Sequence, residues 1–424
     1  MAEMKDRMGR PVVVVTGAGV VTSLGAGKDE NWAKLTAGQS GIRSITRFPT
    51  DNLKTRIAGT IDYLPPESCT AALSERLAEI AAEEAIAQSR LSRIGHFPGP
   101  LFLAVCPIEL EWPQRLEVGG RSGANDKLTY ADLCRASAQF PAYHDRFLFG
   151  SVADHLADKF GTRGSPISLS TACASGASAI QLGVEAIRRG ETDAALCIGT
   201  DGSITPESLI RFSLLSALST GSNDNPQKAA KPFSKNRDGF VMAEGAGALV
   251  LESYESAKSR GAKILGVLEG CGEMTDAFHR TRSSPDGKPI IGCMRNALKD
   301  AGLVPDDIDY VNAHGTSTPE NDKMEALGCT SLFGERMKSI PISSNKSMIG
   351  HTLSAAGAIE AVITLMTLQN QRIPPTINYD LPDPTIPLDV VPNTARGAKM
   401  KHAISNSFGF GGQNVSLVVG LEPA

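Results

Sequence analysis

The chain has 424 residues, 41% hydrophobic and 21% charged, which is typical of a globular protein with a large core. A formal net charge of −4 excludes a broad basic field for nucleic acid, and no apolar run is long enough to span a membrane. The eight cysteines form no C-x-x-C pair and show no zinc spacing, and the first ten residues contain no apolar signal core. We therefore expect a reduced, cytoplasmic protein with free thiols.

The first half of the chain alternates expected strands with expected helices. Its first β-branched run is followed by Thr16-Gly17-Ala18-Gly19, which predicts a tight glycine turn. Strands are expected at Val12–Val15, Ile167–Leu169, Ala194–Ile198 and Gly245–Leu251, and helices at Leu73–Leu91 and Ala177–Arg189.

The second half repeats this alternation, so the predicted class is α/β with mainly parallel sheets. Its last two strands are joined by Phe408-Gly409-Phe410-Gly411-Gly412. Strands are expected within Ala262–Gly270 and at Ile308–Asn312, Ala403–Ser407 and Val415–Gly420, and helices at Lys288–Ala301 and Ile359–Leu368.

A weak internal repeat relates the two halves. Ser165-Pro166-Ile167-Ser168 precedes a turn and a helix, and Ile340-Pro341-Ile342-Ser343 does the same about 175 residues later. In a duplicated fold, Cys173 and His351 would occupy related turns near strand ends, where open α/β sheets bind ligands.

Cys173 lies among Ala, Ser and Gly residues between an expected strand and an expected helix. Small neighbours allow a sharp bend, and a helix N-terminus favours the thiolate, so a nucleophile is one interpretation. A buried, inert cysteine is the other, and the spacing alone does not separate them.

Two histidines also lie in turns of small and polar residues. His314 follows an expected strand, and nearby Thr316 and Thr318 either bind an amide-bearing substrate arm or cap a helix. Lys346 precedes His351 by five residues, and its charge would lower the pKa of that histidine and keep the imidazole neutral. The alternatives are a loop histidine without a task, a surface lysine and a capping histidine.

One cysteine, two histidines and one lysine in such turns indicate acyl transfer combined with carbanion chemistry. The glycine loop 408–412 supplies either a backbone donor with a movable aromatic ring or only a tight hairpin. No phosphate-binding loop is present, and Gly17-Ala18-Gly19 is at most a fragment of a dinucleotide fingerprint.

Four ordered motifs resemble the signature of the β-ketoacyl-acyl carrier protein synthases, and in particular of the elongating type II enzymes. The likeness covers nearly the whole chain. The motifs are Thr171-Ala172-Cys173-Ala174-Ser175-Gly176, Asn312-Ala313-His314-Gly315-Thr316-Ser317-Thr318, Asn345-Lys346-Ser347-Met348-Ile349-Gly350-His351 and Asn406-Ser407-Phe408-Gly409-Phe410-Gly411-Gly412.

The resemblance implies a thiolase fold, with two similar βαβαβαββ halves stacked as a five-layer αβαβα core. An N-terminal half, residues 1–260, would carry the nucleophile, and a C-terminal half, residues 261–424, would carry the histidines and the lysine. It also implies a homodimer that acts on acyl- and malonyl-loaded acyl carrier protein. No cofactor is expected, because phosphopantetheine arrives on the carrier.

The same resemblance implies a role for each site residue. Cys173 would take the acyl chain, and His314 and His351 would stabilise the enolate that forms when malonyl-carrier protein loses carbon dioxide. Lys346 would tune His351. The oxyanion hole and gate would involve Cys173, Phe410 and Phe408, the pantetheine arm would contact Thr316 and Thr318, and a structural cation would be held by Asn312, Glu360, Ser405 and Asn406.

Two departures from the elongating enzymes bear on the substrate. The segment 104–150, with Cys106-Pro107-Ile108-Glu109 and the polar stretch 121–127, does not follow the family pattern, although this region shapes the acyl tunnel. Ser216 stands where an arginine often meets the carrier, and the nearest basic residue is Arg211. A specialised carrier and acyl chain are therefore expected.

Four rivals remain. A polyketide-type or long-chain ketosynthase shares all four motifs. A degradative thiolase would need a second cysteine near the C-terminal glycine loop, a non-catalytic partner subunit would lack Cys173, and a Cys–His hydrolase has no use for Lys346 or a second histidine.

Overall fold

A computed structural model describes residues 4–122 and 129–422. Within these residues, two halves of the chain form sheets with the same strand order. In the first half the order is β1-β8-β7-β5-β6, and in the second it is β9-β16-β15-β10-β11, with β13 (Asp389–Val390) added at the edge. The remaining bounds are β1 Val13–Thr22, β5 Leu101–Val105, β6 Ile167–Leu169, β7 Ala194–Asp201, β8 Gly245–Ser253, β9 Gly266–Thr275, β10 Tyr310–Asn312, β11 Pro341–Ser343, β15 His402–Phe408 and β16 Gln413–Gly420.

The two sheets join where β1 pairs with β9, at Val14–Val267 and Val15–Gly266. Their strand pairings are mixed: β5 runs parallel to β6 and β7, and β10 runs parallel to β11 and β15, but β8 and β16 are antiparallel to both neighbours. The prediction of mainly parallel sheets therefore holds for four of the five strands in each half, and the exceptions are β8 and β16, because the last strand of each half folds back beside its first strand instead of crossing over.

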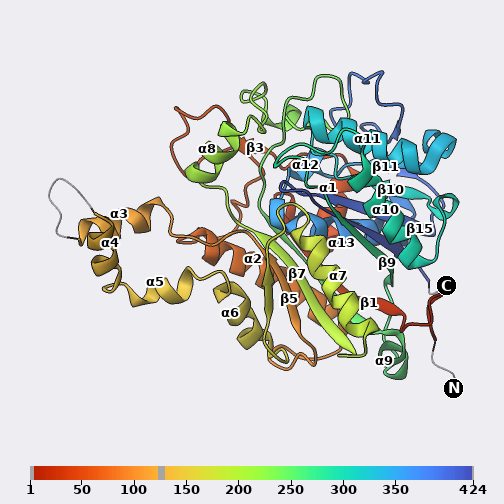
Figure 1. Cartoon of the computed structure of the whole chain (residues 1–424), viewed down its shortest axis with the longest axis horizontal. Helices are drawn as coiled ribbons and strands as arrows, with labels where there is room; N and C mark the ends of the chain where they lie inside the picture. The colour runs from red at the N-terminus through yellow and green to blue at the C-terminus, as the bar shows by residue number, and fades with distance from the viewer. Residues whose placement is uncertain (1–3, 123–128, 423–424) are drawn as a thin grey trace.

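Helices cover both sheets and fill the space between them (Figure 1). The helices α7 (Ser175–Arg188) and α13 (Ala356–Asn370) lie between the sheets in the central apolar core. One outer face is covered by α2 (Thr70–Ser89) and α6 (Ser151–Phe160), and the other by α10 (Lys288–Ala301) and α11 (Pro319–Phe333). The result is the five-layer order that was predicted, with α7 and α13 at equivalent places in the two halves.

One correction concerns Thr16–Gly19, which continues β1 instead of forming a turn. A Cβ atom on Gly17 would lie 2.0 Å from the carbonyl oxygen of Ala85, and one on Gly19 would lie 1.9 Å from that of Ala81. These glycines therefore let α2 approach the strand closely, and a bulge between Val15 and Gly17 adjusts the register.

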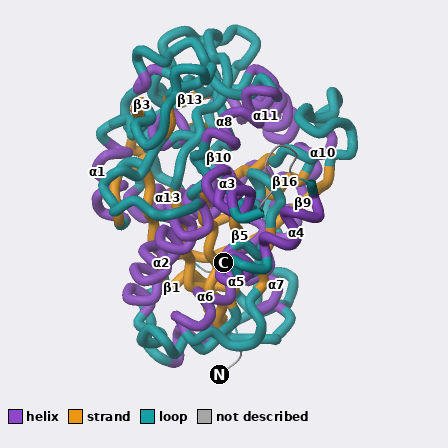
Figure 2. The backbone as a smooth tube through the Cα atoms, turned by 90° about the vertical axis from the view of Figure 1, so that its left-hand side faces the viewer, coloured by secondary structure: helices purple, strands orange, loops and turns teal. Residues whose placement is uncertain are grey.

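The segment that departs from the family pattern forms an arm. It contains α3 (Trp112–Gly120), α4 (Tyr130–Ser137) and α5 (Pro141–Arg146), which extend away from the layered body in Figure 1. Part of the polar stretch, residues 123–127, lies outside the described residues. In Figure 2, where this side faces the viewer, the arm lies in front of the layered body, and the Trp112 N–H at the start of α3 donates to Glu207 of α8 (Pro206–Leu214) at 2.6 Å.

Shorter elements complete the described chain. No helix among these residues is long and apolar enough to cross a bilayer. The shorter elements are α1 (Lys28–Thr36), α9 (Tyr254–Ser259) and α12 (Lys346–Ile349), with β2 (Gly25–Ala26), β3 (Arg43–Ser44), β4 (Ile57–Ala58), β12 (Arg372–Ile373) and β14 (Arg396–Gly397).

Candidate active site

Cys173 lies in the turn between β6 and α7. The preceding residue, Ala172, has a φ of +50°, a strained conformation of the kind that presents nucleophiles at a strand–helix corner. Ser175 stabilises the turn, because its hydroxyl accepts a hydrogen bond from the Thr171 N–H at 2.8 Å and donates one to the Ala172 carbonyl at 2.6 Å. The thiol is therefore held at the start of α7.

Glycines bring this turn close to the equivalent turn of the second half. A Cβ on Gly176 would lie 2.5 Å from the Ala358 nitrogen, and a Cβ on Gly357 would lie 2.5 Å from the Ala177 nitrogen. Only glycine at both positions allows α7 and α13 to begin so close together. The segments that precede these two helices carry Cys173 and His351.

Three side chains converge at this point. The Nε2 atom of His351 lies 3.1 Å from the Cys173 Sγ, and His314 places a ring nitrogen within 4.8 Å of both. The two imidazole rings meet edge to face with their centroids 5.3 Å apart. The predicted constellation is thus assembled from both halves.

Backbone and charged groups set the tautomers of the two imidazoles. The Leu353 N–H faces Nδ1 of His351 at 3.3 Å, and the Lys346 ammonium faces Nδ1 of His314 at 3.4 Å. A nitrogen that faces a donor accepts a hydrogen bond, so in both neutral rings the proton lies on Nε2. A protonated ring nitrogen cannot bind a metal. The two Nε2–H groups are therefore better suited to donating hydrogen bonds than to binding a metal ion.

The electrostatics keep both rings neutral. Burial, and then the charges of Lys346 and His351, hold the pKa of His314 well below its usual range. Burial and the charge of Lys346 do the same to the pKa of His351. Burial raises the pKa of the Cys173 thiol to about 11, whereas a backbone hydrogen bond from Phe410 and the Lys346 charge act in the opposite direction.

Lys346 itself is almost fully buried and is paired with Glu360 of α13. Its nitrogen contacts His314, whereas the sequence pattern pointed to His351; its charge nevertheless acts on both rings. Burial raises the pKa of Glu360 to about 7 in spite of the pairing.

Three further residues shape the site, and the four motifs did not assign them a role in it. Glu325 of α11 accepts hydrogen bonds from the His314 and Gly315 N–H groups at 2.9 and 2.7 Å, which holds the backbone of the histidine turn. The ring of Phe240 packs edge-on against His351 at 5.3 Å. One sequence feature could have identified Glu325. It is a carboxylate in the helix that closely follows His314, among residues that are buried.

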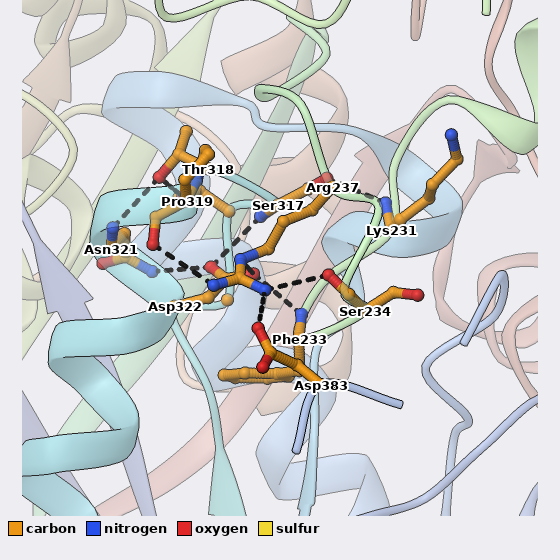
Figure 3. A network of polar contacts seen from close by, with 12 residues as sticks. Lys231, Phe233, Ser234, Arg237, Ser317, Thr318, Pro319, Asn321, Asp322 and Asp383 are labelled. Carbon is orange, nitrogen blue, oxygen red and sulfur yellow. Dashed lines mark hydrogen bonds and ion pairs between the residues drawn. The ribbon is translucent and has the colours of Figure 1, made fainter. Parts of the chain in front are cut away.

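Arg237, the third, ties the Phe240 segment to the turn that follows His314 (Figure 3). Its guanidinium donates to the Asp383 carboxylate at 2.7 Å and to the Ser234 carbonyl at 2.9 Å, and it lies 3.8 Å from the Asp322 carboxylate. Asp322 also accepts from the N–H groups of Phe233 and Ser317. The network therefore connects a loop of the first half to the histidine loop of the second.

Two cavities meet at the thiol. One, of about 460 Å³, is lined by Thr316 and Thr318 and by both histidines. Thr318 has a double role, because its hydroxyl also caps α11 through the Asn321 N–H at 3.2 Å. The other cavity, of about 400 Å³, extends from Cys173 along residues 106–111 and α8. Phe410 lines both cavities, whereas Phe408 is buried beside His314.

The residues predicted to hold a cation are only partly suited to it. The Asn312 Oδ1 and Glu360 Oε2 atoms are buried and have no hydrogen-bond partner, and Ser405 lies opposite Asn312 in the β10–β15 ladder. Two orphaned acceptors of this kind fit a hard cation. The Asn406 side chain instead contacts Glu325 and Ser416.

Comparison with known proteins agrees with this geometry. Residues 10–96 and 118–257 match the β-ketoacyl synthase N-terminal domain, and residues 265–380 match the C-terminal domain. The chain is 38% identical to 3-oxoacyl-[acyl-carrier-protein] synthase 2 of Vibrio cholerae (97% of this chain, 99% of the relative) and 36% identical to the Staphylococcus aureus protein of the same name (96% and 97%).

Solved structures give the same result. A type II polyketide ketosynthase in complex with its acyl-carrier protein aligns with a TM-score of 0.86 at 34% identity, covering 97% of this chain and all of that one. A β-ketoacyl synthase from Burkholderia phymatum aligns with a TM-score of 0.83 at 32% identity, with the same coverage. The fold is therefore the thiolase fold of the condensing acyltransferases. Within that class, the chain belongs to the β-ketoacyl synthase family.

Proposed function

We propose that this protein extends acyl chains by condensing malonyl-acyl carrier protein with an acyl group held on Cys173. The observation that carries the proposal is the convergence on one thiol of two neutral imidazoles whose Nδ1 atoms face donors. A thiol accepts an acyl group, and paired N–H donors stabilise a developing enolate.

In the first step the Cys173 sulfur attacks the thioester carbonyl of the acyl-carrier protein. A carbon–sulfur bond forms to the enzyme, the bond to the pantetheine sulfur breaks, and the proton of the Cys173 thiol passes to that sulfur, so that the carrier leaves as a thiol. The N-terminus of α7 and the backbone N–H groups of Cys173 and Phe410 stabilise the negative oxygen.

In the second step the malonyl group loses carbon dioxide, and the electron pair of the broken carbon–carbon bond forms an enolate. The Nε2–H groups of His314 and His351 donate to its oxygen. The carbanion then attacks the Cys173 thioester, the sulfur leaves, and the product is a 3-oxoacyl-carrier protein two carbons longer. Lys346 helps to keep both rings neutral, and Thr316 and Thr318 bind the pantetheine amides.

Charge and exposed surfaces support the proposed partners. Arg280, Arg282 and Lys323 line the cavity that contains the threonines, together with Asp276 and Glu320, and the excess of basic over acidic side chains suits an acidic carrier. Strand β6 is an edge strand with an exposed Ile167, which a second copy would cover in a homodimer. We place the enzyme in the cytoplasm and assign it no organic cofactor. A structural cation at Asn312 and Glu360 would neutralise their orphaned acceptors.

The test is intact-mass spectrometry after mixing with acyl-carrier protein and then with malonyl-carrier protein. Wild type gains an acyl adduct and releases a 3-oxoacyl product, and Cys173→Ala gains none. The exposed-thiol variant Cys134→Ala is the matched control and behaves as wild type. His314→Ala retains acylation but loses decarboxylation. Release of free acid alone contradicts the proposal.

A polyketide-type ketosynthase is the second candidate, because a ketosynthase of that type is among the aligned structures. It uses the same residues, so repeated extension without reduction of the keto group would identify it in the same experiment.

A further inference from the structure

The cavity that leads away from the threonines is lined by charged side chains as well as by apolar ones such as Phe212 and Leu215. It begins at Cys173 and continues past Cys106 and Ile108. Its remaining lining includes Glu109, Glu111, Arg115, Glu207 and Arg211. An acyl chain gains nothing from contact with this charged part of the lining, which we call the rim.

Ion pairs between two helices and a loop form this rim. Glu109 pairs with Arg211 of α8 and, at 2.8 Å, with Arg115 of α3, and Glu207 of α8 accepts from the Trp112 N–H at 2.6 Å. The Arg211 side chain is 54% exposed. Water therefore reaches the rim, and the side chains of the rim are able to rotate out of the cavity into solvent.

Exposed apolar side chains adjoin the lining of this cavity along the chain: Trp112 follows Glu111, Leu116 follows Arg115, and Leu214 precedes Leu215. On α8, Leu214 lies one turn beyond Arg211 and is 81% exposed. On α3, Trp112 and Leu116 flank Arg115, and Trp112 is 60% exposed. The hydrogen bond between Trp112 and Glu207 places the beginnings of these two helices side by side. We call Trp112, Leu116 and Leu214 the apolar strip.

The relative magnitudes favour opening of the rim by a long chain. An exposed ion pair contributes a factor of about five or less to an equilibrium. Each methylene group that leaves water contributes a factor of about four. About two methylenes buried beyond the rim therefore offset the loss of the Glu109–Arg211 pair.

Some of the residues that form this part of the cavity lie outside the segments that match the family model. The family match to the N-terminal domain stops at residue 96 and resumes at residue 118, so the loop 106–111 and the first turns of α3 lie outside it. Substrate preference is expected to differ where this lining differs.

We propose that the cavity is an open tunnel for long acyl chains, whose ends displace the Glu109–Arg211 pair and lie on the apolar strip. The proposal rests on the condensing function above and names its substrate class: acyl chains longer than the cavity.

The experiment measures acylation rates of Cys173 with octanoyl-, hexadecanoyl- and tetracosanoyl-carrier proteins by intact mass. In wild type the tetracosanoyl rate is expected to be at least as high as the octanoyl rate. Leu214→Asp lowers the ratio of tetracosanoyl to octanoyl rates by about sixteenfold, the effect of about two methylenes. The matched variant Leu327→Asp, an exposed leucine on α11, leaves the ratio as in wild type.

Removal of the rim pair supplies an independent readout. The double variant Glu109→Ala/Arg211→Ala is expected to raise the tetracosanoyl-to-octanoyl ratio by up to about fivefold. A wild type that accepts octanoyl but excludes tetracosanoyl chains would overturn the proposal. So would equal effects of Leu214→Asp and Leu327→Asp, or a loss of dimer mass in Leu214→Asp with no change in the ratio. Failure of every chain, including octanoyl, would instead refute the condensing function.

Discussion

Replacement of Arg237 by methionine should destabilise the protein, because it removes the cation that joins the two loops in Figure 3. The Arg237 side chain is only 7% exposed, and methionine retains most of its apolar stem. The variant leaves two carboxylates, those of Asp322 and Asp383, without their common partner.

The magnitude follows from the pKa of Asp383, which hydrogen bonds from Arg237 and then Thr385 lower from 3.8 to about 2. At about 1.4 kcal/mol per unit, the depressed pKa corresponds to at most about 2.5 kcal/mol of stability. That contribution is fully present above pH 3.8 and is lost as the pH falls toward 2. Breaking a buried pair on one side costs about 3 to 5 kcal/mol, so we expect a loss between about 2 and about 4 kcal/mol at neutral pH.

Urea denaturation of wild type, Arg237→Met, Asp383→Asn and the double variant would measure the free energy of unfolding and the coupling energy. We expect a coupling of about 1 to 2 kcal/mol at neutral pH that declines below about pH 4. Arg237→Lys, which keeps the charge but not the planar fork, should lie between wild type and Arg237→Met. A coupling energy near zero would refute the reasoning.

Three other predictions concern the site. Burial raises the pKa of Glu325 from 4.5 to about 7, so between these pH values the folded state binds more protons than the unfolded state, and the free energy of unfolding falls as the pH rises. Glu325→Gln should flatten this pH dependence, and an unchanged slope would contradict the prediction. Lys346→Met removes a charge that lowers the pKa of both histidines, so the acidic limb of malonyl decarboxylation should move to higher pH, and a profile that stays in place would show that burial alone keeps the rings neutral. Gly176→Ala places a Cβ 2.5 Å from the Ala358 nitrogen, so it should lower the free energy of unfolding by about 1 to 3 kcal/mol and slow acylation. The control is Gly120→Ala, whose added Cβ would have nothing within 4 Å. Equal melting temperatures of the two variants would count against the close approach of α7 and α13.

Elements with a strong local pattern were predicted well. The helix at Lys288–Ala301 was placed with its observed bounds, because it ends at Gly302, whose φ of +67° suits a left-handed cap. The strand Val12–Val15 was found but ended too early. Its continuation through Gly17 and Gly19 depends on the packing of α2, which lies about 65 residues further along the chain.

The residues of the site also fall into those that the sequence identified and those that only the structure revealed. Cys173, His314, Lys346 and His351 were identified because each lies in a short motif whose residue types are unusual for a loop. The partners of these residues were not assigned: Glu325 supports a backbone turn, and Phe240 reaches His351 from more than a hundred residues away.

The amino-acid sequence by itself therefore determined the family, the alternation of strands and helices and the four side chains that meet at the candidate site, because these depend on local residue patterns. Only the tertiary structure decided the reversed directions of β8 and β16, the tautomers of the two imidazoles and the charged rim of the acyl cavity. Each of these depends on atoms that the fold brings together from distant parts of the chain, such as Glu109 and Arg211, and no local pattern contains that information.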